Sequence, residues 1–187
     1  TVTTPSGPAQ RAMLQNALTD AGIEPHQVDF VETHGTGTPL GDPIEVSAIG
    51  RVLCKNREKT LYLGAVKANV GHLDSAAGIA GLIKVVLSLQ HKTIPAHLNF
   101  SEPNRHIPWN DWPIKIPLEN TTWEGKERVA GISAFGMSGT NVHIIVSGAP
   151  EPIMPDGDQL PNPTTTQLLT LSAHTDVPSP NPVKRYD

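Results

Sequence analysis

Two segments of the chain share one arrangement, in which a short apolar stretch is followed by a histidine, a turn of small residues and a helical pattern. Residues 28–33 form the first stretch and are followed by His34. Residues 61–66 form the second and are followed by His72 and a helical pattern over residues 75–90. Buried strands that alternate with helices predict a layered α/β fold.

The other expected elements follow from apolar periodicity and turn chemistry. One apolar stripe predicts a helix over residues 8–21, closed by Gly22 in a left-handed cap. Asp42 as N-cap and Glu45 as the partner in a capping box predict a second helix start, and Ser75 is the expected cap of the third helix. The remaining expectations are strands over 129–135 and 142–146, irregular structure over 93–127, a proline-rich linker from residue 150 and one short strand over 168–172.

Composition narrows the classes of protein. Lys and Arg number 14 against 18 acidic residues without a basic patch, so nucleic acid is not expected as the main partner. The longest apolar run, residues 79–89, is too short to cross a bilayer, and the N-terminus lacks signal-peptide character. A single cysteine excludes an internal disulfide framework and fits a reducing compartment. We expect a cytoplasmic protein without a membrane partner.

The two strand-end histidines are the candidate chemical groups. Neutral imidazoles at the mouth of a cleft can donate hydrogen bonds to developing negative charge. Metal binding is the rival interpretation, but neither His34 nor His72 has a partner at HxxxH or CxxC spacing, so no metal is expected. The remaining histidines are expected to be structural or solvated: His26, His91, His97, His106, His143 and His174.

The residues around these histidines also have competing interpretations. The loop 35–38 could cradle phosphate, but it lacks the Walker lysine and a third glycine, so Thr36 and Thr38 are expected to bind the amides of an extended substrate arm. Lys67 is either a solvated charge or, as we favour, a partner of Asp74 that orients the site and lowers the imidazole pKa. Cys54 ends a helix without an adjacent base and is not expected to be a nucleophile.

Three long motifs resemble one family. They are VETHGTGTPLGDPIE at residues 31–45, KANVGHL at 67–73 and GISAFGMSGTNVH at 131–143. In this order they resemble the C-terminal half of a β-ketoacyl synthase (ketosynthase) domain of a modular type I polyketide synthase, in the thiolase superfamily. The resemblance covers residues 1–149, and residues 150–187 resemble the linker that leads towards an acyltransferase domain.

The resemblance implies both a fold and a reaction. The fold is the C-terminal half of a thiolase-like α-β-α-β-α arrangement, which dimerises when complete. The reaction is a decarboxylative Claisen condensation between an enzyme-bound acyl thioester and a malonyl-type unit, which arrives on the phosphopantetheine of an acyl carrier protein. The domain itself binds no cofactor, and further implied partners are the N-terminal ketosynthase half and the adjacent acyltransferase domain.

The resemblance also implies residue roles. His34 and His72 donate hydrogen bonds to the malonyl thioester oxygen, and Lys67 completes the catalytic set. Asp74 stands where we expect the family's glutamate partner of that lysine, and Thr36 and Thr38 contact the pantetheine arm. The implied oxyanion and gate segment comprises Phe135, Gly136 and Met137, and the Met137 N–H is its donor. Asn141 is a further implied supporting residue.

The family's nucleophilic cysteine lies in the N-terminal half, ahead of residue 1, so we expect the chain alone to be inactive. A partial polypeptide of this kind is expected to expose an apolar face that its other half covers. Two further functions remain open. One is a silent ketosynthase remnant that docks carrier protein or neighbouring domains. The other, a different thiolase-fold enzyme, fits less well because paired histidines suit decarboxylation.

Overall fold

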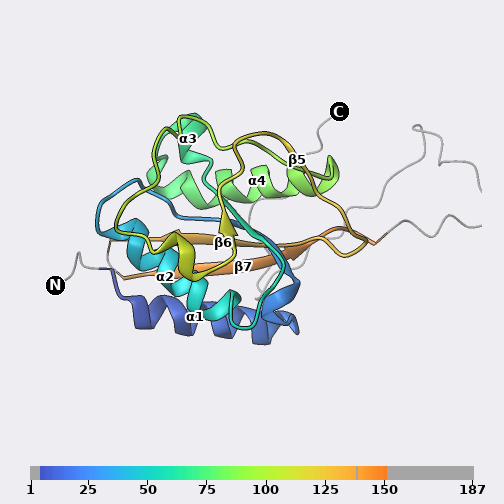
Figure 1. The fold of residues 1–187 in the computed structure, drawn as a ribbon, viewed down its shortest axis with the longest axis horizontal. Helices are drawn as coiled ribbons and strands as arrows, with labels where there is room; N and C mark the ends of the chain where they lie inside the picture. The colour runs from blue at the N-terminus through green and yellow to red at the C-terminus, as the bar shows by residue number, and fades with distance from the viewer. Residues whose placement is uncertain (1–4, 138, 151–187) are drawn as a thin grey trace, which may run out of the picture. The chain divides into compact units, whose positions relative to one another are not determined.

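The computed structural model describes residues 5–137 and 139–150, and its main feature is a five-stranded mixed sheet (Figure 1). The strand order is β4-β2-β1-β6-β7. β1 is parallel to both β2 and β6, β4 is parallel to β2, and β6 and β7 form an antiparallel hairpin. The strands are β1 (Val28–Glu32), β2 (Leu61–Gly64), β4 (Ile114–Lys115), β6 (Val129–Phe135) and β7 (Asn141–Ser147).

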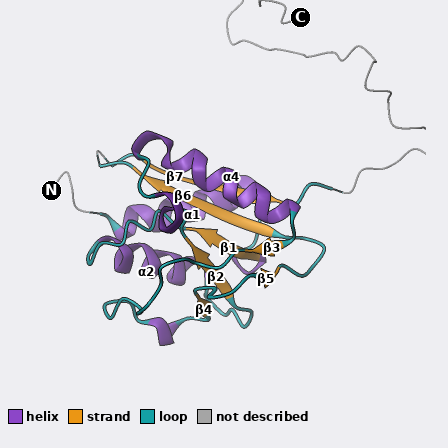
Figure 2. Ribbon diagram, turned by 90° about the horizontal axis from the view of Figure 1, so that it is seen from above, coloured by secondary structure: helices purple, strands orange, loops and turns teal. Residues whose placement is uncertain are grey.

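Helices cover both faces of this sheet, as Figures 1 and 2 show. α1 (Gly7–Ala21) and α2 (Gly41–Leu53) pack on one face, and α4 (Ala77–Gln90) packs on the other. All five residues of β1 are buried, as expected for a central parallel strand covered on both sides. The α/β arrangement expected from the alternating patterns is therefore present.

Local sequence signals account for α1. The Ser6 hydroxyl accepts a hydrogen bond from the Ala9 N–H (3.3 Å), which satisfies one of the free donors at the helix start. Gly22 closes the helix at φ 63°, in the left-handed region where glycine carries no Cβ penalty. Both ends of the helix thus follow from side-chain chemistry that the sequence shows directly.

Two expected helix caps are wrong. α2 begins at Gly41 without a side-chain cap, because the carboxylates of Asp42 and Glu45 turn instead to N–H groups of the preceding loop. α4 begins at Ala77, since Ser75 lies within a 3₁₀ turn, η2 (Asp74–Ala76), and does not cap the helix. In both cases the spacing of residues in the sequence did not predict how the helix begins.

The segment between α4 and β6 is mostly irregular, as its proline content predicts. It contains β3 (Thr93–Ile94), which pairs antiparallel with β5 (Thr121–Thr122), and the 3₁₀ turn η3 (Trp109–Asp111). The other short helices of the described residues are η1 (Pro25–Gln27) and α3 (Lys67–Val70).

The outer side of α4 and the nearby residues 70–73 carry exposed apolar side chains, as expected for a partial thiolase-like fold. They are Val70, Leu73, Ile79, Ile83, Val86 and Leu87. No helix of the described residues is long and apolar enough to span a membrane.

The compact unit comprises Thr1–Ala149. The division of the chain into a ketosynthase part up to residue 149 and a linker beyond it remains a prediction. The expected linker, apart from Pro150, and the expected strand at 168–172 lie outside the described residues.

Candidate active site

The two strand-end histidines lie side by side. The ring centroids of His34 and His72 are 5.4 Å apart, with an interplanar angle of 82°. His34 follows the end of β1, and His72 follows α3 after the end of β2. Because β1 and β2 are parallel neighbours, the segments that follow them meet at the same edge of the sheet. The predicted convergence of the two imidazoles is therefore present.

Backbone hydrogen bonds orient both rings in the same way. The Phe135 N–H donates to Nδ1 of His34 (3.3 Å), and the Asp74 N–H donates to Nδ1 of His72 (3.1 Å). A neutral imidazole has one accepting and one protonated nitrogen, so a ring that accepts at Nδ1 carries its proton on Nε2. Each histidine in its neutral form thus presents an Nε2–H donor.

His34 is held neutral by its surroundings. Burial lowers the pKa of this imidazole to about 4, and the positive charge of Lys67 and the neighbouring His72 act in the same direction. The charged form is disfavoured because it loses water and gains repulsion. At pH 7 His34 is therefore a neutral hydrogen-bond donor, and Lys67 exerts the effect that its position in the sequence suggested.

Two carboxylates of α2 shape the loop that carries His34. Glu45 is fully buried and accepts the N–H groups of His34 (2.7 Å) and Gly35 (3.0 Å), one on each oxygen. Asp42 accepts the Gly37 N–H (3.2 Å). Burial raises the pKa of both carboxyl groups, that of Glu45 to about 7. Residues three apart share a helix face, so the spacing of Asp42 and Glu45 is the sequence signal for their joint binding of this loop.

Gly35 allows this loop to pass close to the sheet. Its φ is 46°, and a Cβ on this residue would lie 2.6 Å from Oγ1 of Thr33 and 2.8 Å from Cβ of Ala65. Both the backbone conformation and the available space thus require glycine.

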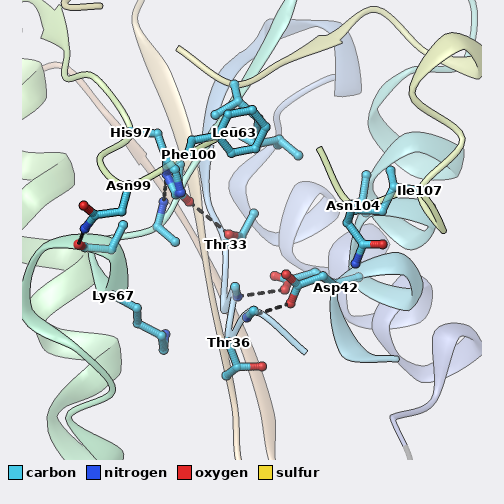
Figure 3. Close-up of a pocket in the computed structure, with 18 of the residues that line it drawn as sticks. Thr33, Thr36, Asp42, Leu63, Lys67, His97, Asn99, Phe100, Asn104 and Ile107 are labelled. Atoms are coloured by element: carbon cyan, nitrogen blue, oxygen red, sulfur yellow. Dashed lines mark hydrogen bonds between the residues drawn. The ribbon is translucent and has the colours of Figure 1, made fainter. Parts of the chain in front are cut away.

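Lys67 lies at the start of α3 and lines a cavity of about 440 Å³, where Figure 3 shows it with Thr36 and Asp42. Burial lowers its pKa, while the carboxylates of Glu32, Glu45 and Asp42 oppose this effect. This lysine therefore lies among acidic groups that come from β1 and α2.

The expected pairing of Lys67 with Asp74 is wrong. No ion pair joins these two residues within the described part of the chain. Asp74 has φ 47° and begins η2, and its N–H donates to His72. It supports the site through its backbone, because the turn directs its amide at the imidazole.

The predicted pantetheine-binding threonines occupy the same loop. Thr36 lines the cavity, whereas Oγ1 of Thr38 accepts the Gly41 N–H (3.0 Å) and so helps to form the turn into α2. Their contact with a substrate arm remains a prediction.

The predicted oxyanion and gate segment lies next to His34. The Phe135 ring centroid is 5.1 Å from that of His34, and Phe135 pairs with Asn141 in the β6–β7 hairpin. The Gly136 N–H donates to the Thr140 carbonyl (2.7 Å), which closes the hairpin. Met137 is 86% exposed. The structure thus brings the segment to the histidines, and the donor role of the Met137 N–H remains a prediction.

Cys54 forms the C-terminal cap position of α2 and is buried. Burial raises the pKa of its thiol to about 11, despite the nearby Arg57. A thiol in this setting is protonated and a poor nucleophile. This agrees with the sequence-based interpretation.

A pair of adjacent histidines at the edge of a mixed α/β sheet, without a reactive thiol in the described residues, is the arrangement expected for part of a condensing enzyme. Two family models match the chain: "Beta-ketoacyl synthase, C-terminal domain" over residues 1–101 and "Ketoacyl-synthetase C-terminal extension" over residues 103–179. The chain therefore belongs to the β-ketoacyl synthase family.

Curated relatives are polyketide synthases. The chain is 47% identical over 157 residues to polyketide synthase GfsA of Streptomyces halstedii. This match covers 81% of the chain and 2% of that protein. It is 48% identical over 151 residues to erythronolide synthase EryA2 of Saccharopolyspora erythraea, covering 79% of the chain and 4% of that protein. The chain therefore spans only a small part of these relatives.

Solved ketosynthases have the same fold. The ketosynthase from module 6 of the bacillaene synthase of Bacillus subtilis 168 matches with a TM-score of 0.76 at 39% identity, covering 80% of this chain and 28% of that one. The oxazolomycin ketosynthase domain OzmH KS7 of Streptomyces albus JA3453 matches with a TM-score of 0.76 at 32% identity, covering 81% and 28%. The predicted family and thiolase-like fold are confirmed.

Proposed function

We propose that the chain supplies the decarboxylation side of a polyketide ketosynthase, which joins an enzyme-bound acyl thioester to a malonyl-type unit. The observation that carries this proposal is the pair of imidazoles 5.4 Å apart, each with Nδ1 accepting a backbone N–H. Two Nε2–H donors can then converge on one thioester carbonyl oxygen.

This arrangement matches the charge that decarboxylation develops. When the bond between the malonyl carboxylate and Cα breaks, carbon dioxide leaves and the electron pair forms an enolate, with negative charge on the thioester oxygen. Donors aimed at that oxygen stabilise the transition state, and loss of one donor of this kind commonly costs about 3 kcal/mol. Because the pKa of His34 is lowered to about 4, this residue acts as a hydrogen-bond donor in its neutral form at pH 7.

The condensation is completed by groups from both halves of the enzyme. The enolate carbon attacks the acyl thioester on the cysteine of the N-terminal half, a carbon–carbon bond forms and the cysteine thiolate leaves. In the present chain, the proposed donor to the acyl oxygen is the Met137 N–H, two residues after Phe135, whose ring centroid lies 5.1 Å from that of His34.

The proposed partners follow from the same geometry. The exposed apolar side of α4 borders a groove of about 580 Å³ and suits coverage by the N-terminal ketosynthase half. An acyl carrier protein brings the malonyl unit on phosphopantetheine, which Thr36 and Thr38 contact, and the domain needs no cofactor of its own. An adjacent acyltransferase domain and homodimer formation complete the proposed assembly.

Co-expression of the chain with its N-terminal half tests the proposal. Release of carbon dioxide from malonyl carrier protein is expected in the complex, and none is expected from the chain alone. The His72→Ala variant of the complex is expected to lose most of this activity. A folded complex without decarboxylation, or one that keeps full activity as His72→Ala, contradicts the proposal and favours the docking-module alternative.

A further inference from the structure

A buried ion pair joins the end of β1 to α4, and the proposed chemistry does not use either residue. Nζ of Lys84 lies 2.7 Å from Oε2 of Glu32, and the two side chains are 14% and 2% exposed. The other carboxylate oxygen, Oε1, accepts the Val66 N–H. Both oxygens are therefore satisfied in an interior where a lone carboxylate would be strongly destabilising.

Two glycines, Gly64 and Gly81, leave space for this pair because they carry no side chain. A Cβ at Gly81 would lie 3.1 Å from Cγ of Glu32, and a Cβ at Gly64 would lie 3.1 Å from Nζ of Lys84. The ammonium group also lies 5.5 Å from the centre of the Phe30 ring, within the range of a cation–π contact. The interior is thus shaped to hold a lysine against this carboxylate.

Glu32 occupies a central position relative to the histidines. It lies two residues before His34 on the same chain segment. Val66 directly precedes Lys67, whereas Lys84 lies on the helix that follows His72. One carboxylate therefore contacts both ends of the segment that carries Lys67 and His72, and it belongs to the strand that leads to His34.

Hydrogen bonds connect the contact at Val66 to the site. The Val66 carbonyl accepts the Asn69 N–H (2.8 Å), and the Lys67 carbonyl accepts the Gly71 N–H (2.9 Å). Gly71 is the residue before His72. A change in the orientation of the Val66 amide would therefore move both Lys67 and the backbone that leads to His72.

We propose that the Glu32–Lys84 ion pair positions Lys67 and His72 for decarboxylation, which makes Lys84 a positioning residue of the enzyme. This inference rests on the proposed function, because it assigns the pair a role in that chemistry. A pair with a purely structural role would change stability but not the turnover of the folded enzyme. Displacement of reacting groups by about 1 Å lowers rates by about a hundredfold, so small shifts are measurable.

The test uses the complete ketosynthase that contains this chain. Lys84→Met is expected to lower kcat for malonyl decarboxylation by about tenfold to a hundredfold. KM for malonyl carrier protein is expected to stay within about twofold, because Thr36 and Thr38 lie on a different loop. Lys84→Arg is expected to recover most of the rate, since a guanidinium also pairs with carboxylate.

Lys59→Met is the matched control. It removes the partner of Asp29 (2.5 Å), which lies near the start of β1, whereas Glu32 ends that strand, and it is expected to leave kcat unchanged. A folded Lys84→Met enzyme with the wild-type rate would overturn the inference, as would an equal loss in Lys59→Met. If Lys84→Met does not fold, the neutral double variant Glu32→Gln/Lys84→Met decides: a tenfold lower kcat supports the positioning role, and the wild-type rate overturns it.

His72→Ala, measured in parallel, separates this inference from the proposed function. Full decarboxylation by His72→Ala contradicts the proposed function and, with it, the positioning role. Loss of activity in His72→Ala together with full activity in Lys84→Met contradicts the positioning role alone.

Discussion

The backbone N–H of Phe135 donates a hydrogen bond to Nδ1 of His34 at 3.3 Å, across 101 residues of sequence. This contact joins the end of β6 to the loop after β1, two parallel neighbours in the sheet. It also determines which nitrogen of the imidazole faces the site with its proton. The hairpin thus prepares His34 for donation through Nε2.

Replacement of His34 tests that donor directly. His34→Ala in the complete ketosynthase is expected to lower kcat for decarboxylation by about a hundredfold, because it removes one donor to the enolate oxygen. His34→Gln is expected to lose less, because its amide can place an N–H near the former Nε2. Decarboxylation rates of the two variants check this, and equal rates in His34→Ala and wild type would contradict the donor role.

Lys67→Met is expected to raise the pKa of His34 from about 4 towards 6.5 without reaching it. The positive charge of Lys67 disfavours the protonated imidazole, whereas burial, the larger cause, remains in the variant. Titration of isotope-labelled histidine by NMR measures the shift. Lys115→Met, on the edge strand β4, is a control that is expected to leave the pKa of His34 unchanged. A lower pKa of His34 in Lys67→Met would contradict the prediction.

His143 is expected to make the folded state less stable in acid. Its Nδ1 shares a hydrogen bond with Ser133 (2.9 Å), whereas its Nε2 is buried against Gly131 without a partner in the described residues. Burial lowers the pKa of this imidazole from 6.5 to about 4. The unfolded chain therefore takes up a proton that the folded state resists, and stability falls as the pH drops from 6.5 to 4.

A full shift of this size corresponds to about 3 kcal/mol. Urea unfolding of the wild type and of His143→Gln at pH 7 and pH 5 measures the effect. The variant is expected to lose less stability on acidification than the wild type. Identical pH dependence in the two proteins would show that His143 is not responsible.

Gly35→Ala is expected to impair both stability and decarboxylation, because the new Cβ would meet Thr33 and Ala65 at 2.6 and 2.8 Å. Gly37→Ala is the matched control: it also has positive φ, 73°, but nothing lies within 4 Å of its Cβ. The control is therefore expected to lose only about 1 kcal/mol for the left-handed backbone. Thermal unfolding and decarboxylation rates compare the two, and equal losses would contradict the predicted clash.

Much of the fold could be predicted from local patterns. The apolar stripe and Gly22 predicted α1, the apolar stretch over residues 28–33 predicted β1, and strands were expected over 129–135 and 142–146, where β6 and β7 lie. These features depend on neighbours in sequence, so periodicity and turn chemistry suffice to recognise them. The histidine motifs identified the family for the same reason: each is a continuous stretch.

The partners of the charged residues could be recognised only in the tertiary structure. Sequence spacing predicted a capping-box role for Glu45, whereas its carboxylate binds the loop that carries His34. Spacing also predicted an ion pair between Lys67 and Asp74, whereas Lys67 lies near acidic groups of β1 and α2. The pairing of Glu32 with Lys84 spans 52 residues. A buried charged side chain must be paired, and its partner can only be a residue that is adjacent in space. Strand order and helix packing therefore decide which charged residues form ion pairs in the interior.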